Sequence, residues 1–119
     1  DVRVPHIGGV VEYFRIEGTE LVLHAQQSGF TSHVYGSRNL DMALAADVTG
    51  DGRIEILAPT QDLTALGVLS RTEDGVMVVA ELPLPGRLTS NVAGSTLADG
   101  SVAVAVGTSD GILRIYAAG

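Results

Sequence analysis

The chain has 119 residues, of which 14 are acidic and seven are basic, and it contains no cysteine, so its formal net charge is −7 at pH 7. The missing basic cluster argues against a nucleic-acid partner, and the missing thiols exclude disulfides, thiolate metal sites and thiol catalysis. No long apolar run and no basic leader occur, so we expect neither a membrane span nor a signal peptide within these residues.

Short apolar runs punctuated by glycine extend through the whole chain. Apolar residues make up 45% of the sequence but aromatics only 4%, and this mixture of small and β-branched residues suits sheets packed on both faces. No segment keeps an apolar stripe at helical spacing, so we expect an all-β chain. The runs predicted to be strands are 9–16, 19–25, 42–47, 53–58, 64–70, 76–82, 91–97, 101–108 and 112–117.

The connections between these runs group the strands. Glu17-Gly18 predicts a hairpin turn, whereas residues 26–39 predict a longer surface connection. The turns within 42–82 are all short, which indicates a four-stranded antiparallel meander. The proline-containing stretch 83–86 then ends it.

The most informative stretch lies between the first two strands of this meander. Asp47, Thr49 and Asp51 place oxygen side chains at alternate positions, and Glu55 follows four residues later. Together with the backbone carbonyl of Arg53 they offer about five oxygens to one hard cation, and Ca²⁺ takes six to eight including waters. The sequence therefore predicts one calcium site at these five residues. The alternative is a glycine-rich hairpin turn with solvated carboxylates.

An EF-hand loop opens with the same pattern, but it requires a bidentate Glu at its twelfth position. Counted from Asp47, that position is Ala58. An EF-hand also needs flanking helices, whereas residues 53–57 alternate between polar and apolar in the manner of a strand. The sequence therefore excludes an EF-hand.

An internal similarity appears when the sequence is shifted by 48 residues. The triplet 60–62 then aligns with 108–110, and Asp51 aligns with Asp99. The residues aligned with the other three predicted side-chain ligands are Ser95, Leu97 and Ala103. We expect this second loop to keep the turn and to lack the cation.

The acidic loop resembles the D-x-D/N-x-D-G-x-x-D loop of FG-GAP and VCBS repeats in integrin-like β-propellers, with Thr49 and Glu55 as departures from that pattern. The hairpin 107–116 is also similar to hairpins of WD-repeat and quinoprotein propellers. The resemblance implies a single segment, 1–119, of two to three four-stranded antiparallel blades that is incomplete at both ends. Residues 9–25 and 91–117 would be partial blades, and 42–82 a full blade with the calcium loop.

By this resemblance we expect a non-catalytic, calcium-stabilised module that serves as a scaffold or recognition surface in the extracellular space or periplasm. Its partner would be a protein or a carbohydrate. An incomplete propeller would expose apolar faces and sheet edges. We therefore also expect association with copies of itself or with the remaining blades of a longer chain.

Two alternatives stay open. The histidines His6, His24 and His33 show no metal-ligand spacing, and no serine lies in a nucleophile elbow. A propeller enzyme, such as a polysaccharide lyase or a quinoprotein-like dehydrogenase, would therefore carry its catalytic residues elsewhere. A carbohydrate-binding lectin would instead use an aromatic stacking platform. The aromatic residues are Tyr13, Phe14, Phe30, Tyr35 and Tyr116.

Overall fold

The computed structural model describes residues 2–3, 9–34, 38 and 41–117, and these ranges contain strands and turns but no helix. The strands are β1 (Val2–Arg3), β2 (Val10–Glu17), β3 (Glu20–Ser28), β4 (Leu44–Ala46), β5 (Glu55–Pro59), β6 (Ala65–Thr72), β7 (Gly75–Pro83), β8 (Ala93–Thr96), β9 (Val102–Gly107) and β10 (Leu113–Ala117). The prediction of an all-β chain is confirmed. In the described ranges there is accordingly nothing helical that is long and apolar enough to cross a membrane.

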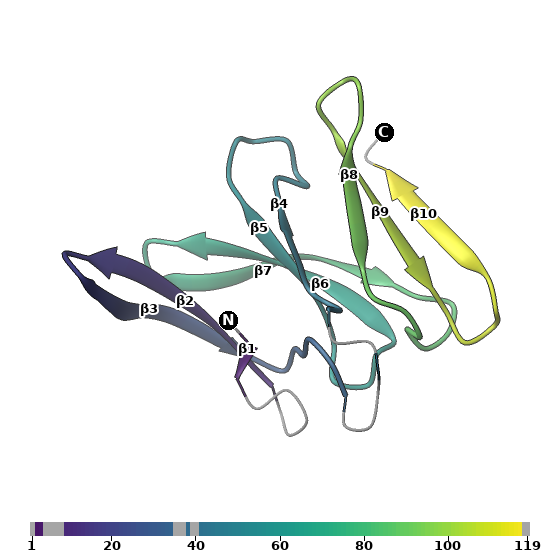
Figure 1. Ribbon diagram of the computed structural model, residues 1–119, viewed down its shortest axis with the longest axis horizontal. Helices are drawn as coiled ribbons and strands as arrows, with labels where there is room; N and C mark the ends of the chain where they lie inside the picture. Colours follow the sequence, from purple (N-terminus) through teal and green to yellow (C-terminus); the bar gives the residue numbers. More distant parts are fainter. Residues whose placement is uncertain (1, 4–8, 35–37, 39–40, 118–119) are drawn as a thin grey trace.

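The strands form three antiparallel sheets that lie side by side in chain order (Figure 1). The first sheet has the order β1-β2-β3, the middle sheet β4-β5-β6-β7 and the third sheet β10-β9-β8. Neighbours in sequence are therefore neighbours in each sheet, because short turns return the chain antiparallel to the strand just completed. The loops that join β4 to β5 and β8 to β9 project from the same side of the molecule (Figure 1).

The middle sheet is covered on both faces. One apolar cluster, built around Phe30, Ala58 and Leu69, lies between it and the first sheet. The larger cluster joins it to the third sheet and comprises Met42, Leu57, Leu63, Leu66, Leu84, Leu88, Val92, Val104 and Val106. Consecutive residues of a strand point to opposite faces, so Leu57 and Ala58 enter different clusters.

Close approach between sheets depends on two glycines. The ring of Phe30 lies so close to Gly67 of β6 that a Cβ at this position would overlap it. A Cβ at Gly94 of β8 would lie 2.6 Å from Cδ2 of Leu44, which comes from β4. Leu44 of the middle sheet thus meets a glycine of the third sheet, and Phe30, which follows β3, meets a glycine of the middle sheet.

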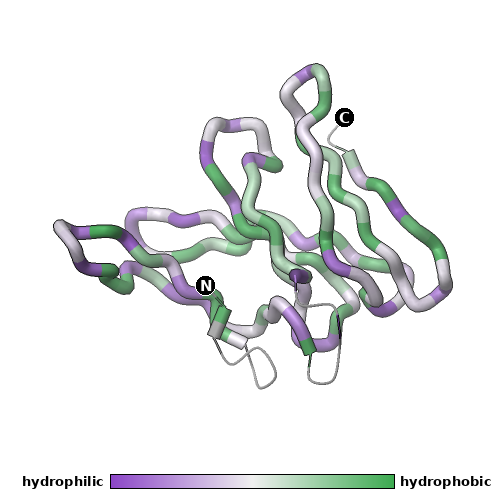
Figure 2. The backbone as a smooth tube through the Cα atoms, in the orientation of Figure 1, coloured by the Kyte–Doolittle hydropathy of each residue, from purple (hydrophilic) through white to green (hydrophobic). Residues whose placement is uncertain are grey.

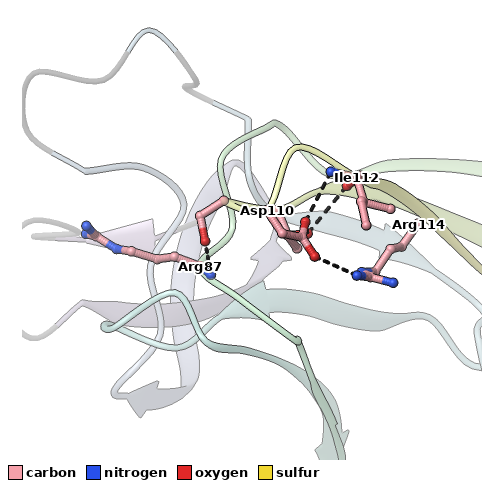
Figure 3. A network of polar contacts seen from close by, with 6 residues as sticks. Arg87, Asp110, Ile112 and Arg114 are labelled. Atoms are coloured by element: carbon pink, nitrogen blue, oxygen red, sulfur yellow. Dashed lines mark hydrogen bonds and ion pairs between the residues drawn. The ribbon is translucent and has the colours of Figure 1, made fainter.

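The turns that follow β5 and β9 have the same construction. The carboxylate of Asp62 accepts hydrogen bonds from the hydroxyls of Thr60 and Thr64, both at 2.7 Å, and from the backbone N–H of Thr64 at 3.1 Å. Asp110 accepts from the Thr108 hydroxyl, from the Ile112 N–H at 3.1 Å and from Nη2 of Arg114 at 2.6 Å (Figure 3).

Each of these turns contains one residue in the left-handed region. In the second turn it is Gly111, with φ of 79°, and in the first it is Leu63, with φ of 63°. A left-handed leucine is strained, and such strain persists only where surrounding contacts impose it. Here the Leu63 side chain is 2% exposed within the larger cluster, so burial offsets the cost of the backbone conformation.

These turns predict a loss of stability in acid. Hydrogen bonds to the charged carboxylates, first from Thr60 and from Thr108 respectively, lower the pKa of Asp62 and of Asp110 from 3.8 to about 2. A lowered pKa in the folded state adds stability above the ordinary pKa, and this stability is lost as the pH falls through the folded value. The midpoint of thermal unfolding should therefore drop between about pH 4 and pH 2.

The matching measurement is a thermal unfolding series from neutral pH into acid for the wild type and for Asp62→Asn and Asp110→Asn. At neutral pH each variant should have a lower midpoint of thermal unfolding than the wild type. On acidification this midpoint should fall less than it does in the wild type. Glu73→Gln, at the exposed tip of another turn, is the control and should retain the full acid-dependent drop. Variants that lose as much as the wild type would show that the two carboxylates do not cause it.

Apolar side chains remain exposed at both ends of the row of sheets, and hydrophobic stretches of the chain, drawn in green, reach both ends in Figure 2. At the tip of the β2–β3 hairpin, Ile16 and Leu21 are 73% and 70% exposed. On β10, Leu113 and Ile115 are 69% and 68% exposed. Contiguous exposed apolar surface on a folded protein marks an interaction surface.

Candidate metal centre

The loop between β4 and β5 turns tightly at two glycines. Gly50 and Gly52 have φ of 76° and 86°, a region that residues with a Cβ avoid. The loop carries Asp47 and Asp51, and β5 begins directly after it with Glu55. The glycine conformations therefore fold this short loop so that its acidic residues meet at one end of the middle sheet.

Asp47 organises the loop by accepting hydrogen bonds from its backbone. One carboxylate oxygen, Oδ1, accepts from the N–H groups of Gly50 at 2.8 Å and of Asp51 at 3.2 Å, and Oδ2 accepts from Gly52 at 2.9 Å. Asp51 in turn accepts from the N–H of Arg53 at 2.8 Å. The inward-pointing N–H groups offset part of the negative charge of both carboxylates.

Glu55 is the buried member, with 1% of its surface exposed. Its Oε2 accepts from the N–H groups of Val48 at 3.0 Å and Thr49 at 3.2 Å, and its Oε1 accepts from the Thr49 hydroxyl at 3.1 Å. A buried carboxylate is tolerated only where such bonds or an opposite charge compensate for its lost hydration. Glu55 therefore ties the start of the loop to the start of β5.

Asp47, Asp51 and Glu55 each offer an oxygen, and these atoms lie within 4.8 Å of one another. Three carboxylates this close repel one another, and a cation among them would remove that repulsion. The cluster has the composition and the spacing to hold a metal ion. In the part of the chain that the structure describes, it is the single group of three acidic, histidine or cysteine side chains with this geometry.

Thr49 and Arg53, the two other predicted ligands, differ in their relation to the acidic cluster. The Thr49 hydroxyl donates to Glu55, and the Arg53 side chain is exposed while its N–H donates to Asp51. Thr49 thus contacts a member of the cluster. At the acidic cluster, Thr49 could bind a cation only through a lone pair of its hydroxyl oxygen, and Arg53 only through its backbone carbonyl.

The loop between β8 and β9 keeps the turn without the acidic cluster. Gly100 has φ of 86°, equal to that of Gly52, and Asp99 accepts from the N–H of Ser101 at 2.9 Å as Asp51 does from Arg53. No acidic residue occupies the places of Asp47 and Glu55 in this loop, which carries Ser95 and Ala103 there. It is a natural control for the acidic loop.

The remaining candidates do not converge on a second site among the described residues. His24 contacts Glu17 at 3.0 Å on the exposed β2–β3 hairpin, and His33 contacts the adjacent Ser32 at 3.2 Å. Phe30 is buried, and the Tyr13 hydroxyl donates to the carbonyl of Leu69 at 3.3 Å. His6 and Tyr35 lie outside the described residues.

A groove that the sequence did not reveal lies beside the acidic loop, between the middle and third sheets. Its volume is about 370 Å³, and Val48 and Thr49 of the loop contribute to its wall. The other lining residues are Leu57, Leu66, Val68, Ala80, Leu82, Val102, Val104, Tyr116 and Ala117. A β-strand pattern predicts which residues share a face, but not how far two sheets separate.

Comparison with known proteins gives no relative from which a function could be transferred. No protein-family model matches the chain, and neither a curated protein nor a solved structure is significantly similar to it.

Proposed function

We propose that this chain is a non-catalytic, calcium-stabilised module of the FG-GAP/VCBS β-propeller type that acts as a scaffold or recognition surface. The observation that carries the proposal is the convergence of Asp47, Asp51 and Glu55 to within 4.8 Å at the loop that joins β4 to β5. These strands are the first two of a four-stranded antiparallel sheet. In the FG-GAP and VCBS repeats that the loop resembles, the ion-binding loop likewise joins the first two strands of a blade.

Calcium is the ion that the donor set fits best. All of the available side-chain donors are oxygens, which favour hard cations, and Ca²⁺ accepts irregular shells completed by water. Asp51 is exposed and leaves room for such waters, whereas Glu55 is buried and fixed. In this proposal the Thr49 hydroxyl and the Arg53 carbonyl complete the protein ligands.

The ion would act by stabilising the folded loop. It neutralises the mutual repulsion of the three carboxylates, and a ligand that binds only the folded state adds about 2.7 kcal/mol at a concentration of 100 Kd. Because Thr49 supplies no charge, we expect an affinity typical of extracellular modules, about 10⁻⁴ to 10⁻³ M. Such an affinity suits the proposed extracellular or periplasmic location.

The exposed ends of the row of sheets support the scaffold role. Ile16 and Leu21 at one end, and Leu113 and Ile115 at the other, offer apolar faces of the kind that neighbouring sheets cover. We propose that further blades or copies of the chain associate there, while a protein or carbohydrate partner is recognised by the assembled surface.

Calorimetric titration with Ca²⁺ of the wild type, Asp51→Asn and Asp99→Asn tests the proposal. Both substitutions keep an oxygen that accepts the turn N–H, from Arg53 in one loop and from Ser101 in the other. Asp51→Asn removes one charge from the acidic cluster and should weaken Ca²⁺ binding at least about tenfold, which corresponds to 1.4 kcal/mol. Asp99→Asn should bind as the wild type does.

The control separates loss of a ligand from general damage to a loop. Equal binding by both variants would mean that the ion does not sit at the acidic cluster. Absence of any Ca²⁺-dependent heat or thermal shift in the wild type at millimolar concentration would remove calcium from the proposed function.

A further inference from the structure

Four aspartates of the chain are followed directly by glycine, namely Asp51, Asp74, Asp99 and Asp110. Each of these pairs lies in a connection between two antiparallel strands. In an Asp-Gly pair the backbone nitrogen of the glycine can attack the side-chain carboxyl carbon of the aspartate, because a glycine has no Cβ to obstruct the approach. The folded structure treats the four pairs differently.

The reaction is a rearrangement that needs no reagent except water. The glycine nitrogen forms a bond to Cγ and gives up its proton, while the protonated carboxyl group loses a hydroxyl, so one water leaves and a succinimide ring closes. Water then opens the ring at one of its two carbonyls. Opening at the backbone carbonyl gives isoaspartate, in which the chain runs through Cβ and Cγ and the free carboxylate is attached to Cα.

Hydrogen bonds occupy both reacting groups in three of the four pairs. The carboxylates of Asp51, Asp99 and Asp110 each accept from the backbone N–H two residues further on, at 2.8 Å, 2.9 Å and 3.1 Å respectively. The N–H of the glycine itself donates to an oxygen of the same turn, at 2.9–3.0 Å. Attack at these pairs therefore requires both bonds to open first.

Further hydrogen bonds keep two of these carboxylates ionised. The Ser101 hydroxyl donates to Asp99 at 2.6 Å, and this bond is the main cause of the lowered pKa of Asp99. The Thr108 hydroxyl and Arg114 lower the pKa of Asp110 to about 2. Since ring closure consumes the protonated carboxyl group, a lowered pKa reduces the reactive fraction at neutral pH.

Asp74 lies in a different setting, at the exposed tip of the β6–β7 hairpin. Within the described part of the chain, no hydrogen bond or ion pair reaches its carboxylate. Gly75 has φ of 147°, whereas the other three glycines have φ between 79° and 86°. Thr72 and Gly75 are the last pair of the hairpin, and opening of a terminal pair costs little free energy.

We propose that Asp74 is a site of covalent modification, at which the Asp74-Gly75 pair rearranges to isoaspartate while the other three Asp-Gly pairs of the folded chain remain intact. The product adds one backbone methylene to the turn between Thr72 and Gly75. Its exposed α-carboxylate has the chemistry that an isoaspartate-specific methyltransferase accepts. Calcium has no part in the reaction, so this proposal stands or falls separately from the metal site.

The test is prolonged incubation of the intact 119-residue protein at neutral pH and physiological temperature, followed by trypsin digestion. The chain contains no lysine, so trypsin cleaves only after arginine and places Asp74 in the peptide 72–87, which holds no other aspartate. Asp51 falls in 39–53, and Asp99 and Asp110 fall in 88–114. Chromatography separates the isoaspartyl peptides, and electron-transfer fragmentation assigns the modified residue.

Isoaspartate at Asp74 should accumulate at least about tenfold faster than at each of the other three aspartates, because freeing a carboxylate from charge-assisted hydrogen bonds is costly. A parallel incubation in guanidinium chloride at the same pH removes the folded contacts, and the four sites should then convert at similar rates. Asp74→Glu keeps the charge but would require a six-membered ring, so isomerisation within 72–87 should cease.

A second variant tests the protective role of the hydrogen bonds. Ser101→Ala removes the hydroxyl that donates to Asp99 and should speed conversion at Asp99, while the rate at Asp74 stays unchanged. Equal rates at all four aspartates of the folded protein would overturn the proposal. So would conversion of Asp74 in guanidinium chloride alone, since the folded hairpin would then protect it.

Discussion

Replacing Glu55 with alanine should lower the free energy of unfolding by about 3 kcal/mol, even in the presence of a chelator. The side chain is 1% exposed and accepts from the N–H groups of Val48 and Thr49 and from the Thr49 hydroxyl. Alanine would leave these donors without their acceptor and would open a cavity at the start of β5. Urea denaturation in excess EDTA measures the effect without any contribution from a bound ion.

Glu81→Ala provides the control, because Glu81 is an exposed glutamate within a strand of the same sheet. Its effect should stay within about 0.5 kcal/mol, as for most surface substitutions. If Glu55→Ala unfolded at the same urea concentration as the wild type in EDTA, the buried carboxylate would not be holding the loop. The acidic cluster would then have no structural role beyond binding an ion.

Phe30→Ala should destabilise the protein by about 3 kcal/mol, which is the lower end of the range for truncating a buried phenylalanine. Phe30 is 6% exposed and joins the first and middle sheets, with its ring directly over Gly67. Gly67→Ala should cost about 1–3 kcal/mol, because the new methyl group forces the ring out of its place. Both values come from chemical denaturation of the single variants.

The double variant tests whether these two effects share one contact. With the Phe30 ring removed, the methyl group of Gly67→Ala enters space that the ring had filled. The combined loss should be smaller than the sum by about 1 kcal/mol, as expected for residues in direct contact. Strict additivity would contradict the packing of the first sheet on the middle sheet through this pair.

Most strands and the type of their turns could be predicted from the sequence alone. Alternating apolar residues gave the all-β class, because side chains of a strand alternate between its faces and no helical period was present. Asp62, Asp110 and Gly111 mark turns at a spacing that short-range backbone chemistry fixes. The acidic residues of the β4–β5 loop were identified from the alternate spacing of Asp47, Thr49 and Asp51, with Glu55 four residues later, which suits the oxygen ligands of a hard cation.

How far each of these residues is buried depends on tertiary packing and could not be predicted from the sequence. The sequence pattern identified Glu55 as a candidate ligand but did not predict that it is only 1% exposed, because its burial results from the loop that folds over it. The sequence also did not predict the two-residue strand β1 or the register shifts at Tyr13/Phe14 and Val68/Leu69. The groove depends on how separate sheets stack, and such long-range packing leaves no periodic signal in the sequence.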